Sequence, residues 1–426
     1  MNRLIARIGS IAPWRVALGL LALLAARDAQ NLLRPEFYAE DGVWYAQAYT
    51  QGLASLALPQ AGYLNTVQRV AAVAAQPLPL AWAPLAFSLY AYALYAALLL
   101  FLLSPRLGDA WPQRGVRILF ALLLVLAPAT EEVFGVLTNT QWILAPLAFL
   151  VLASAPPVRA GGRCFDAAVL FLGGLSGPFF IALVPLAARQ WQRREDRRDR
   201  ARMWRLLLLS GAAAVQAVFL LFNLAQRPAV QAVGADGQTL LRILAVIAMQ
   251  AELGARLVGH VVALSSPWRD ASLPGIALGL AAIGGYALGW RAAPPLLRQF
   301  MVFAVLMFAA ALYRPVVDPA PGLLQWPLMA AHPPAGGRYY FFLLLAWWGG
   351  MFAIVARRRG IEAALARMAI ALTLCVGVPL DWPRWHADGH DAFMAQARAF
   401  AAAAPGTRFV IPVRPAWFTP LVLTRK

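Results

Sequence analysis

Residues 338–359 read RYYFFLLLAWWGGMFAIVARRR, and this stretch decides the class of fold. No side chain within 339–356 is charged. An α-helix needs about 20 predominantly apolar residues to cross a bilayer. The three arginines that follow predict the cytoplasmic end, because cytoplasmic loops are enriched in positive charge. We therefore expect a transmembrane helix over 339–356.

The composition of the whole chain extends this expectation. Of 426 residues, 61% are hydrophobic and 13% are charged, whereas a soluble domain carries about a quarter charged residues. A soluble globular enzyme is therefore excluded. The net charge of +18 would suggest nucleic acid in a soluble protein, but here we assign it to membrane borders and phosphates. Apart from Lys426 the basic residues are arginines, which suit bidentate phosphate contacts, although a high-GC genome would give the same bias.

Apolar stretches along the chain predict an all-α polytopic membrane protein with about eleven transmembrane helices. We expect a transmembrane domain over 1–380 and a small segment over 381–426 on the outer side. The predicted helices cover 12–33, 79–104, 116–130, 140–155, 165–176, 178–189, 205–226, 273–291, 298–313, 339–356 and 366–380.

Arginine-rich loops set the expected orientation. The run RQWQRREDRRDRARMWR at 189–205 is expected in the cytoplasm, as is the N-terminus. Successive loops must alternate between the two sides of the membrane. This alternation is kept only if 165–189 is a pair of short helices broken within LSGPFF. It also requires 240–266 to lie outside as an interfacial amphipathic helix, which leaves 34–78 as the first outer loop. In the outer tail, DAFMAQARAFAAAA predicts a helix and TRFVIPV a short strand.

The first outer loop contains LLRPEFYAEDGVWYAQAY at 32–49. Carboxylates beside hydrocarbon are costly and are functional candidates; here they are Glu40 and Asp41, with Glu36 just before them. Asp41 is equally suited to cap a helix that begins near Val43. The aromatic side chains around this motif fit an interfacial belt, or a wall on which a sugar stacks. Further candidate substrate contacts in this loop are Tyr63 and Asn65.

Two other predicted outer elements carry polar residues. PATEEVFGVLTNTQW at 128–142 contributes two carboxylates and two amides, which bind a substrate or satisfy one another between helices. HPPAGGRYYFF at 332–342 places an arginine at the outer end of a span, where it binds a phosphate or snorkels to lipid headgroups. The candidate residues are Glu131, Glu132, Asn139, Gln141, His332, Arg338 and Tyr339.

Other signals are weaker. His386 and His390 match no metal-site spacing, and the two cysteines, Cys164 and Cys375, lie too far apart in sequence to suggest a framework. The sequence contains no Walker loop, GxSxG, HExxH or dinucleotide fingerprint, which gives no support to nucleotide-driven pumping or to soluble-type hydrolase chemistry.

Three motifs together carry a resemblance to a known superfamily. AEDG at 39–42 is similar to the acidic motif that follows the first span in GT-C glycosyltransferases. GGLSGPFFIALVP at 173–185 resembles a segment of the lipid-A aminoarabinose transferases and protein mannosyltransferases that usually reads close to KGP, with Ser176 in place of the lysine. RYYFFLLLAWW at 338–348 resembles their Arg-Tyr helix but lacks its proline.

The resemblance implies a GT-C-like helical bundle that transfers a sugar from a polyprenyl-phosphate donor to a lipid or glycan acceptor. Transfer would be inverting, on the outer face of a bacterial inner membrane. Asp41 would be the general base with Glu40 as its companion, and Arg338 with Tyr339 would hold the donor phosphate. No nucleic acid is implied. A divalent cation, Mg²⁺ or Mn²⁺, stays an open alternative, since the superfamily contains members with and without one.

Two other functions compete with this interpretation. A transporter or flippase of lipid-linked sugars would place ionisable groups near the bilayer midplane and often shows an inverted repeat. The acidic residues here gather at predicted membrane edges, which favours the enzyme. A polymerase or ligase of surface polysaccharide would also use outer arginines and stays an alternative.

Overall fold

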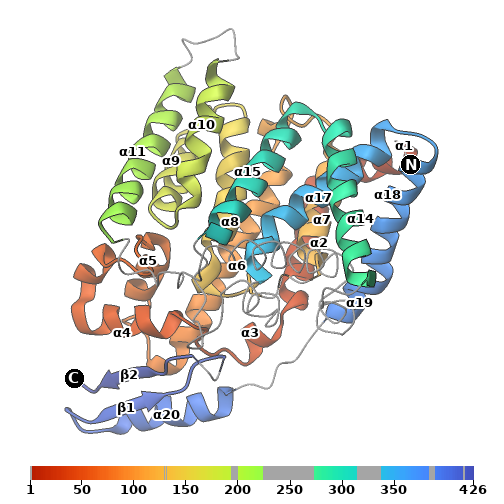
Figure 1. Ribbon diagram of the computed structural model, residues 1–426. Helices are drawn as coiled ribbons and strands as arrows, with labels where there is room; N and C mark the ends of the chain where they lie inside the picture. The colour runs from red at the N-terminus through yellow and green to blue at the C-terminus, as the bar shows by residue number, and fades with distance from the viewer. Residues whose placement is uncertain are drawn as a thin grey trace, which may run out of the picture. The chain divides into compact units, whose positions relative to one another are not determined.

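The computed structural model is predominantly helical (Figure 1). The chain divides into two compact units. Unit 1 comprises residues 1–16, 102–132 and 225–382, and unit 2 comprises 17–101, 133–224 and 383–426. The structure describes residues 2–128, 130, 132–192, 200–223, 273–313, 337–382, 389–415 and 418–426.

In unit 1, the helix predicted at 339–356 is α17, which packs against α14, α15 and α18. Its apolar surface is buried on nearly every side, as expected of a helix that is hydrophobic all round. Gly289 of α14 and Gly350 of α17 let the two backbones approach: a Cβ at Gly289 would lie 2.8 Å from the Gly350 Cα. The helices of unit 1 are α1 (Asn2–Ser10), α7 (Arg114–Leu126), α14 (Leu273–Ala292), α15 (Pro295–Tyr313), α17 (Gly337–Arg357), α18 (Ile361–Leu372) and α19 (Val378–Asp381).

Unit 2 holds the first loop, the following spans and the C-terminal segment. The chain breaks at Leu175–Pro178 between α9 and α10, where the sequence predicted it. Its helices are α2 (Pro13–Arg27, which begins in unit 1), α3 (Gln30–Leu33), α4 (Asp41–Gln51), α5 (Thr66–Ala74), α6 (Ala83–Leu102), α8 (Gln141–Ala153), α9 (Ala160–Gly174), α10 (Phe179–Gln192), α11 (Arg200–Phe222) and α20 (His390–Ala402), with short 3₁₀ turns at Gly52–Ala57, Leu80–Trp82 and Leu137–Asn139.

Each predicted span coincides with a helix, but most of these helices are short. Among the described residues, three helices are long and apolar enough to cross a membrane: Leu80–Leu102, Arg200–Phe222 and Arg338–Arg357. Shorter apolar helices cover Leu137–Ala153, Phe179–Arg189 and Pro295–Ala310. These helices support membrane association, while the expected number of about eleven crossings stays a prediction. The interfacial helix expected at 240–266 lies outside the described residues.

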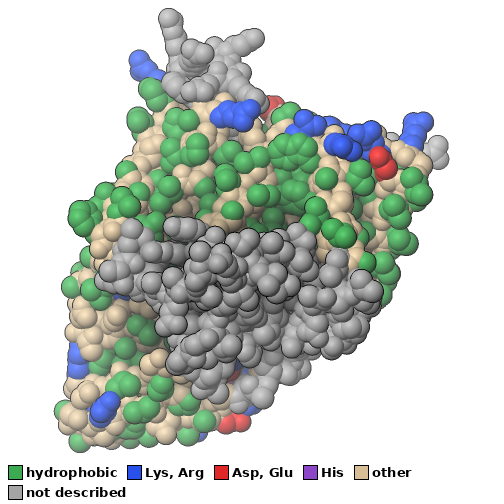
Figure 2. Space-filling view, in the orientation of Figure 1, with side chains coloured by type: hydrophobic (Ala, Val, Ile, Leu, Met, Phe, Trp, Pro, Cys, Tyr) green, Lys and Arg blue, Asp and Glu red, His purple; other side chains and the backbone are tan. Residues whose placement is uncertain are grey.

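The α11 helix shows why the protein needs an apolar environment. Large hydrophobic side chains along it are exposed, with Leu207 at 65%, Leu221 at 67% and Phe222 at 85% of their full surface. Hydrophobic side chains, interspersed with tan atoms, are visible on the surface in the region of α11 in the space-filling view (Figure 2). Soluble proteins rarely leave such a contiguous surface in water, whereas lipid solvates it well.

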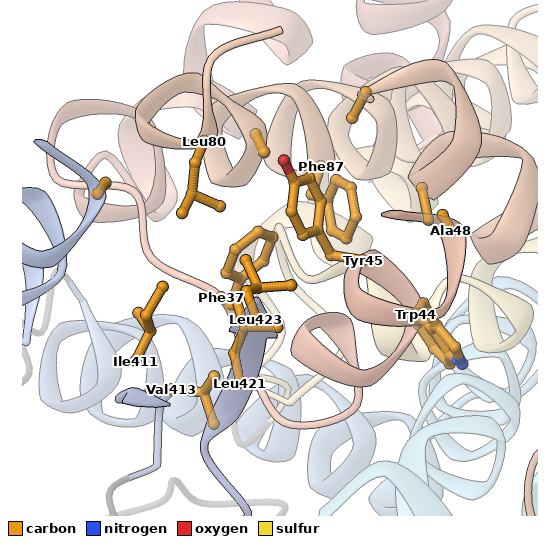
Figure 3. Close-up of a cluster of buried hydrophobic side chains, with 14 of the residues drawn as sticks. Phe37, Trp44, Tyr45, Ala48, Leu80, Phe87, Ile411, Val413, Leu421 and Leu423 are labelled. Carbon is orange, nitrogen blue, oxygen red and sulfur yellow. The ribbon is translucent and has the colours of Figure 1, made fainter. Parts of the chain in front are cut away.

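The C-terminal segment folds against the first loop. The predicted tail helix is α20, and the predicted strand is β1 (Arg408–Ile411); the sequence did not predict its antiparallel partner β2 (Leu421–Thr424). The register pairs Arg408 with Thr424 and Ile411 with Leu421. Apolar residues of both strands enter one buried cluster with α4 and the start of α6 (Figure 3). The apolar side of the tail therefore packs against α4 and the start of α6 within unit 2.

The aromatic residues after the first span lie in this cluster and not in a belt. Phe37 is 0% exposed, and Trp44 and Tyr45 are also buried. Phe37 stacks edge-on against Phe87 and Phe393, with ring centroids 5.3 and 5.6 Å away. The interpretation of these three rings as an interfacial belt or a sugar-stacking wall is therefore wrong, because the tail covers them.

Candidate functional site

The AEDG motif at 39–42 is held in place by the C-terminal segment. The Ala39 amide donates to the Arg414 carbonyl at 2.6 Å, and the Arg414 amide donates to the Phe37 carbonyl at 2.8 Å. Gly42 lies directly under the tail: a Cβ there would come within 3.0 Å of the Val413 side chain and 3.3 Å of the Leu421 Cβ. A side chain at Gly42 would therefore be tightly packed against the tail, a contact that only the folded tail reveals.

A polar contact fixes the same junction. Glu36 accepts a hydrogen bond from the Gly389 amide at 2.9 Å, and its other oxygen lies 3.8 Å from the Arg414 guanidinium. The His390 ring contacts the Pro35 carbonyl at 2.9 Å. Glu36 and His390 therefore anchor the tail to the loop. His386 lies outside the described residues.

Asp41 opens the α4 helix and is almost fully buried, with 3% of its surface exposed. The helix begins at Asp41 and not near Val43, and no side chain caps it. Its Oδ2 accepts a hydrogen bond from the Tyr38 amide at 3.2 Å, whereas the buried Oδ1 accepts none. The alternative that Asp41 serves only as a helix cap is therefore wrong.

The surroundings of Asp41 give it an unusual proton affinity. Burial raises the pKa of Asp41 from 3.8 to about 8, and the nearby Glu40 charge raises it further, while hydrogen bonds from Tyr38 and Thr138 oppose the change. A carboxyl with a pKa near neutrality exchanges its proton readily under working conditions. Perturbed carboxyls of this kind are concentrated at functional sites, although structural groups show them too.

Glu40 is joined to the second polar element of the sequence. Its Oε2 accepts a hydrogen bond from the Thr138 hydroxyl at 3.2 Å. Thr138 lies in the short turn Leu137–Asn139 that precedes α8. The structure thus brings together the AEDG motif and the TNTQW segment, through a threonine that the sequence reasoning did not select.

Arg338 and Glu132 form a separate pair within unit 1. The Arg338 amide donates to one Glu132 oxygen at 2.8 Å, and its Nη1 donates to the other at 3.0 Å. The guanidinium lies 4.9 Å from the centre of the Tyr339 ring. Glu132, expected to contact substrate, therefore neutralises the arginine at the start of α17. Arg338 and Asp41 belong to different units, so their meeting in one site stays a prediction.

The remaining predicted residues serve mainly local structure or lie outside the described part. Asn65 is buried and donates to the Tyr63 carbonyl at 3.2 Å, which closes the turn before α5. Gln141 accepts a hydrogen bond from Gln68, and Asn139 is buried in the preceding turn. Glu131 and His332 lie outside the described residues.

Two polar residues of α5 were missed. Arg69 is 1% exposed, and its Nη1 donates to the Gln47 side chain at 2.8 Å. Gln68 is fully buried beside it, and its Oε1 accepts no hydrogen bond. The residue pair QR within TVQRVAAVA could have indicated them, because an arginine within an apolar helical segment is energetically costly unless it has a partner.

The α5 helix is mounted firmly on the other helices of unit 2. The Thr66 amide donates to the Leu175 carbonyl at 3.1 Å, and the Val67 amide donates to the Ser176 hydroxyl at 2.8 Å. Before the helix, the Gln216 side chain bonds both the amide and the carbonyl of Leu64, at 3.0 and 2.9 Å. The break between α9 and α10 therefore caps the N-terminus of α5, and Ser176 acts there as a structural acceptor.

Metal-ligating side chains do not gather at the described part of this site. No group of three or more His, Cys, Asp or Glu residues suited to a metal ion occurs among the described residues. Glu40 and Asp41 would offer two carboxylates, and Mg²⁺ is usually bound through one or two carboxylates together with water and substrate phosphate oxygens. Use of a divalent cation stays a prediction.

Comparison of the chain with models of known protein families, with curated proteins and with solved structures finds no match. What the protein does is therefore inferred from its residues and their geometry.

Proposed function

We propose that the protein is a membrane glycosyltransferase of GT-C type. It moves a sugar from a polyprenyl-phosphate donor to a hydroxyl of a lipid or glycan acceptor, at the outer face of a bacterial inner membrane. The observation that carries the proposal is the Asp41 carboxyl, which is buried, has one oxygen without a hydrogen bond, and has a pKa raised to about 8.

The chemistry of a general base explains these properties together. The Asp41 carboxylate would accept the proton of the acceptor hydroxyl as that oxygen attacks the anomeric carbon of the donor. The bond between this carbon and the phosphate oxygen breaks, its electron pair stays on the phosphate, and the anomeric configuration inverts. A base works best when its pKa lies near the operating pH, as burial arranges here.

Glu40 supports this role from the neighbouring position. Its hydrogen bond from Thr138 fixes the carboxylate beside Asp41, and its negative charge favours proton uptake by Asp41. The tail adds rigidity, since Arg414 and Val413 hold the turn in which both acids lie. A base must be positioned to within a fraction of an ångström to contribute fully.

The leaving phosphate also needs charge stabilisation. Arg338 with Tyr339 stays the expected donor-phosphate contact from the resemblance. Because Glu132 already pairs with the Arg338 guanidinium, a phosphate at this position would compete with that carboxylate. Arg338→Ala should then reduce donor use by less than the loss caused by substitution of the base.

The test is a transfer assay with full-length protein purified in detergent. A panel of polyprenyl-phosphate hexoses and pentoses is supplied with a lipid extract as acceptor, and release of polyprenyl phosphate is followed by mass spectrometry. Asp41→Asn should reduce release at least a hundredfold, which is the lower end of the contribution of a general base. The matched control is Asp391→Asn, because that side chain is 83% exposed and its substitution should leave the rate unchanged.

Two results would contradict the proposal. Full activity of Asp41→Asn would remove Asp41 as the base. Failure of the wild-type protein to consume any donor, together with absence of polyprenyl phosphate among lipids that co-purify with it, would reject the glycosyltransferase function itself.

A further inference from the structure

The Arg69 side chain is buried without enough partners. It extends from α5, is 1% exposed, and ranks among the largest fully buried side chains of the described residues. Its Nη1 donates to the Gln47 amide oxygen at 2.8 Å, but its Nε and Nη2 are buried without any hydrogen-bond partner. Among the described residues, no carboxylate pairs with it.

The two unpartnered nitrogens lie on one edge of the guanidinium. The Nε–H and one N–H of Nη2 point in the same direction, which makes the fork that binds two oxygens of a carboxylate or phosphate in parallel. Gln47 occupies the opposite nitrogen and so fixes the plane of the group. The side chain is therefore oriented so that its bidentate edge has no hydrogen-bond partner.

The charge at Arg69 is retained. Burial lowers the pKa of Arg69 to about 10, which still leaves the guanidinium protonated at neutral pH. A buried charge without a counter-ion costs several kcal/mol. An anion that is not part of the described chain offers the simplest compensation for this cost.

Other buried arginines of the chain show what a structural role looks like. The Arg117 Nη1 donates to the Leu102 and Ser104 carbonyls at 2.9 and 2.6 Å. Arg205 pairs with Asp166 at 2.5 Å and donates to carbonyls near the end of α8. Arg117 and Arg205 also leave their Nε without a hydrogen-bond partner, but both bind backbone oxygens at a helix end, whereas Arg69 leaves two nitrogens unpartnered and has a single neutral amide. A purely structural reading does not account for Arg69.

We infer that Arg69 is an anion-binding site for a phosphate group, with Gln47 as the residue that positions its guanidinium. Phosphate fits because three oxygens allow two bonds to the fork while a third stays available. The Gln68 Oε1 and the Trp44 Nε1 are also buried without hydrogen-bond partners, and their residues lie on α5 and α4, which pack against each other.

The site belongs to the same unit as Asp41, on the helix next to α4. If the proposed transfer reaction holds, Arg69 takes the place of Arg338, whose guanidinium already pairs with Glu132, as the contact of the glycosyl donor's phosphate, and this one step rests on the proposed function. The binding site itself does not, because the argument for an anion uses only the burial and the bonding of Arg69.

Binding is measured on the purified full-length protein in a neutral detergent. Inorganic phosphate and farnesyl phosphate are titrated in separate arms at constant ionic strength, with tryptophan fluorescence as the readout and affinities confirmed by calorimetry. Arg69→Gln should weaken binding at least tenfold, the equivalent of about 1.4 kcal/mol. Arg408→Gln is the matched control, since Arg408 is exposed on β1, and it should leave the affinity unchanged.

The two arms identify the source of the phosphate. Tighter Arg69-dependent binding of farnesyl phosphate indicates a lipid headgroup, and equal Arg69-dependent binding of both probes indicates a free phosphate. Binding that is absent, or that survives Arg69→Gln unchanged, overturns the inference.

A second variant guards against misfolding of Arg69→Gln. Gln47→Glu keeps Arg69 but supplies a carboxylate that competes with the ligand, so it should weaken phosphate binding several-fold; unchanged affinity overturns the inference. Asp41→Asn separates this site from the proposed reaction, because it should abolish transfer and leave phosphate binding intact. Arg69-dependent binding by a wild-type protein that transfers no sugar would reject the proposed function alone.

Discussion

Arg205 and Arg69 are two equally buried arginines of unit 2 with opposite surroundings. Each is 1% exposed. Arg205 lies 2.5 Å from a carboxylate oxygen of Asp166, which is itself 0% exposed, and its Nη1 donates to the Ser154 carbonyl at 3.1 Å. Arg69 has one amide partner and two unpartnered nitrogens. The paired charge of Arg205 therefore holds helices together, whereas Arg69 is the arginine for which we infer a ligand.

The same contrast applies to buried carboxylates. Asp166 has a guanidinium as its partner, whereas Asp41 has an oxygen that accepts no hydrogen bond. Buried polar groups in stable cores are nearly always satisfied. Where they are not, the protein gives up stability, and such positions are typical of sites that bind or react. Substitutions at each kind of position test whether paired and unpartnered buried groups differ in their effect on stability.

The largest effect is expected for Asp166→Ala. This change leaves the Arg205 charge buried without its counter-ion, and loss of one partner of a buried pair costs about 3–5 kcal/mol. Arg69→Met is its counterpart, and it should change the free energy of unfolding by less than about 1 kcal/mol or increase it. Thermal unfolding in detergent compares the two variants. If Asp166→Ala is no more destabilising than Arg69→Met, the two arginines do not differ as the structure indicates.

A pH-dependent gain in stability is expected for Asp41→Asn. The folded pKa of about 8 exceeds the ordinary value of 3.8, so the folded state binds the Asp41 proton more tightly than the unfolded state does. The stability that this proton provides is therefore complete at low pH and is lost as the pH rises towards 8. Asparagine removes the loss and should raise stability at pH 8 by roughly 3 kcal/mol, about half of what the pKa difference alone would give.

The measurement for Asp41 is a series of melting curves from pH 5 to pH 8.5. The melting temperature of Asp41→Asn should exceed that of the wild-type protein least at pH 5 and by a growing margin as the pH rises towards 8. Asp391→Asn, at an exposed position, should follow the wild-type curve throughout. Parallel curves for Asp41→Asn and wild type would show that the carboxyl has an ordinary proton affinity.

Glu132→Gln tests an intermediate case, a pair that is buried on one side only. Glu132 is 4% exposed, but the Arg338 side chain keeps 20% of its surface in contact with solvent. The arginine left behind is therefore partly hydrated, and we expect a cost of about 1–2 kcal/mol, that of a hydrogen bond to a charged group. Thermal unfolding measures it against Glu362→Gln, whose pair with Arg358 is exposed on both sides. A cost above that of Asp166→Ala would reverse the order set by burial.

The sequence predicted much of the helical fold, because apolar length is a local property. It located the α17 span, the break between α9 and α10, the tail helix and one tail strand. It did not predict that the tail would cover Phe37, Trp44 and Tyr45, since packing between segments more than 300 positions apart leaves no local pattern. Nor did it predict that Val413 and Leu421 would pack against Gly42.

The candidate site shows the same limit. The sequence indicated Asp41 as a candidate, because a carboxylate that directly follows an apolar span can be recognised from the residues alone. It counted Arg205 among the arginines that mark a cytoplasmic loop, although the side chain is buried against Asp166. It passed over Arg69, because an isolated arginine in a short amphipathic segment is normally exposed. The role of each arginine depends on its partners in the folded protein, and the number of arginines in a loop does not show which partners they have.

The smallest effect is expected for Gln47→Glu in the absence of ligand. The new carboxylate would face the Arg69 Nη1 at the 2.8 Å distance that the amide oxygen now occupies, and it would compensate part of the buried charge. Because the added carboxylate must itself be desolvated, we expect a net gain of only about 0.5–1 kcal/mol. Thermal unfolding of ligand-free protein measures the gain, with Gln47→Leu as the control that removes the amide without adding charge and should destabilise. A Gln47→Glu variant less stable than Gln47→Leu would mean that Arg69 already has a counter-ion, and the contrast with Arg205 would disappear.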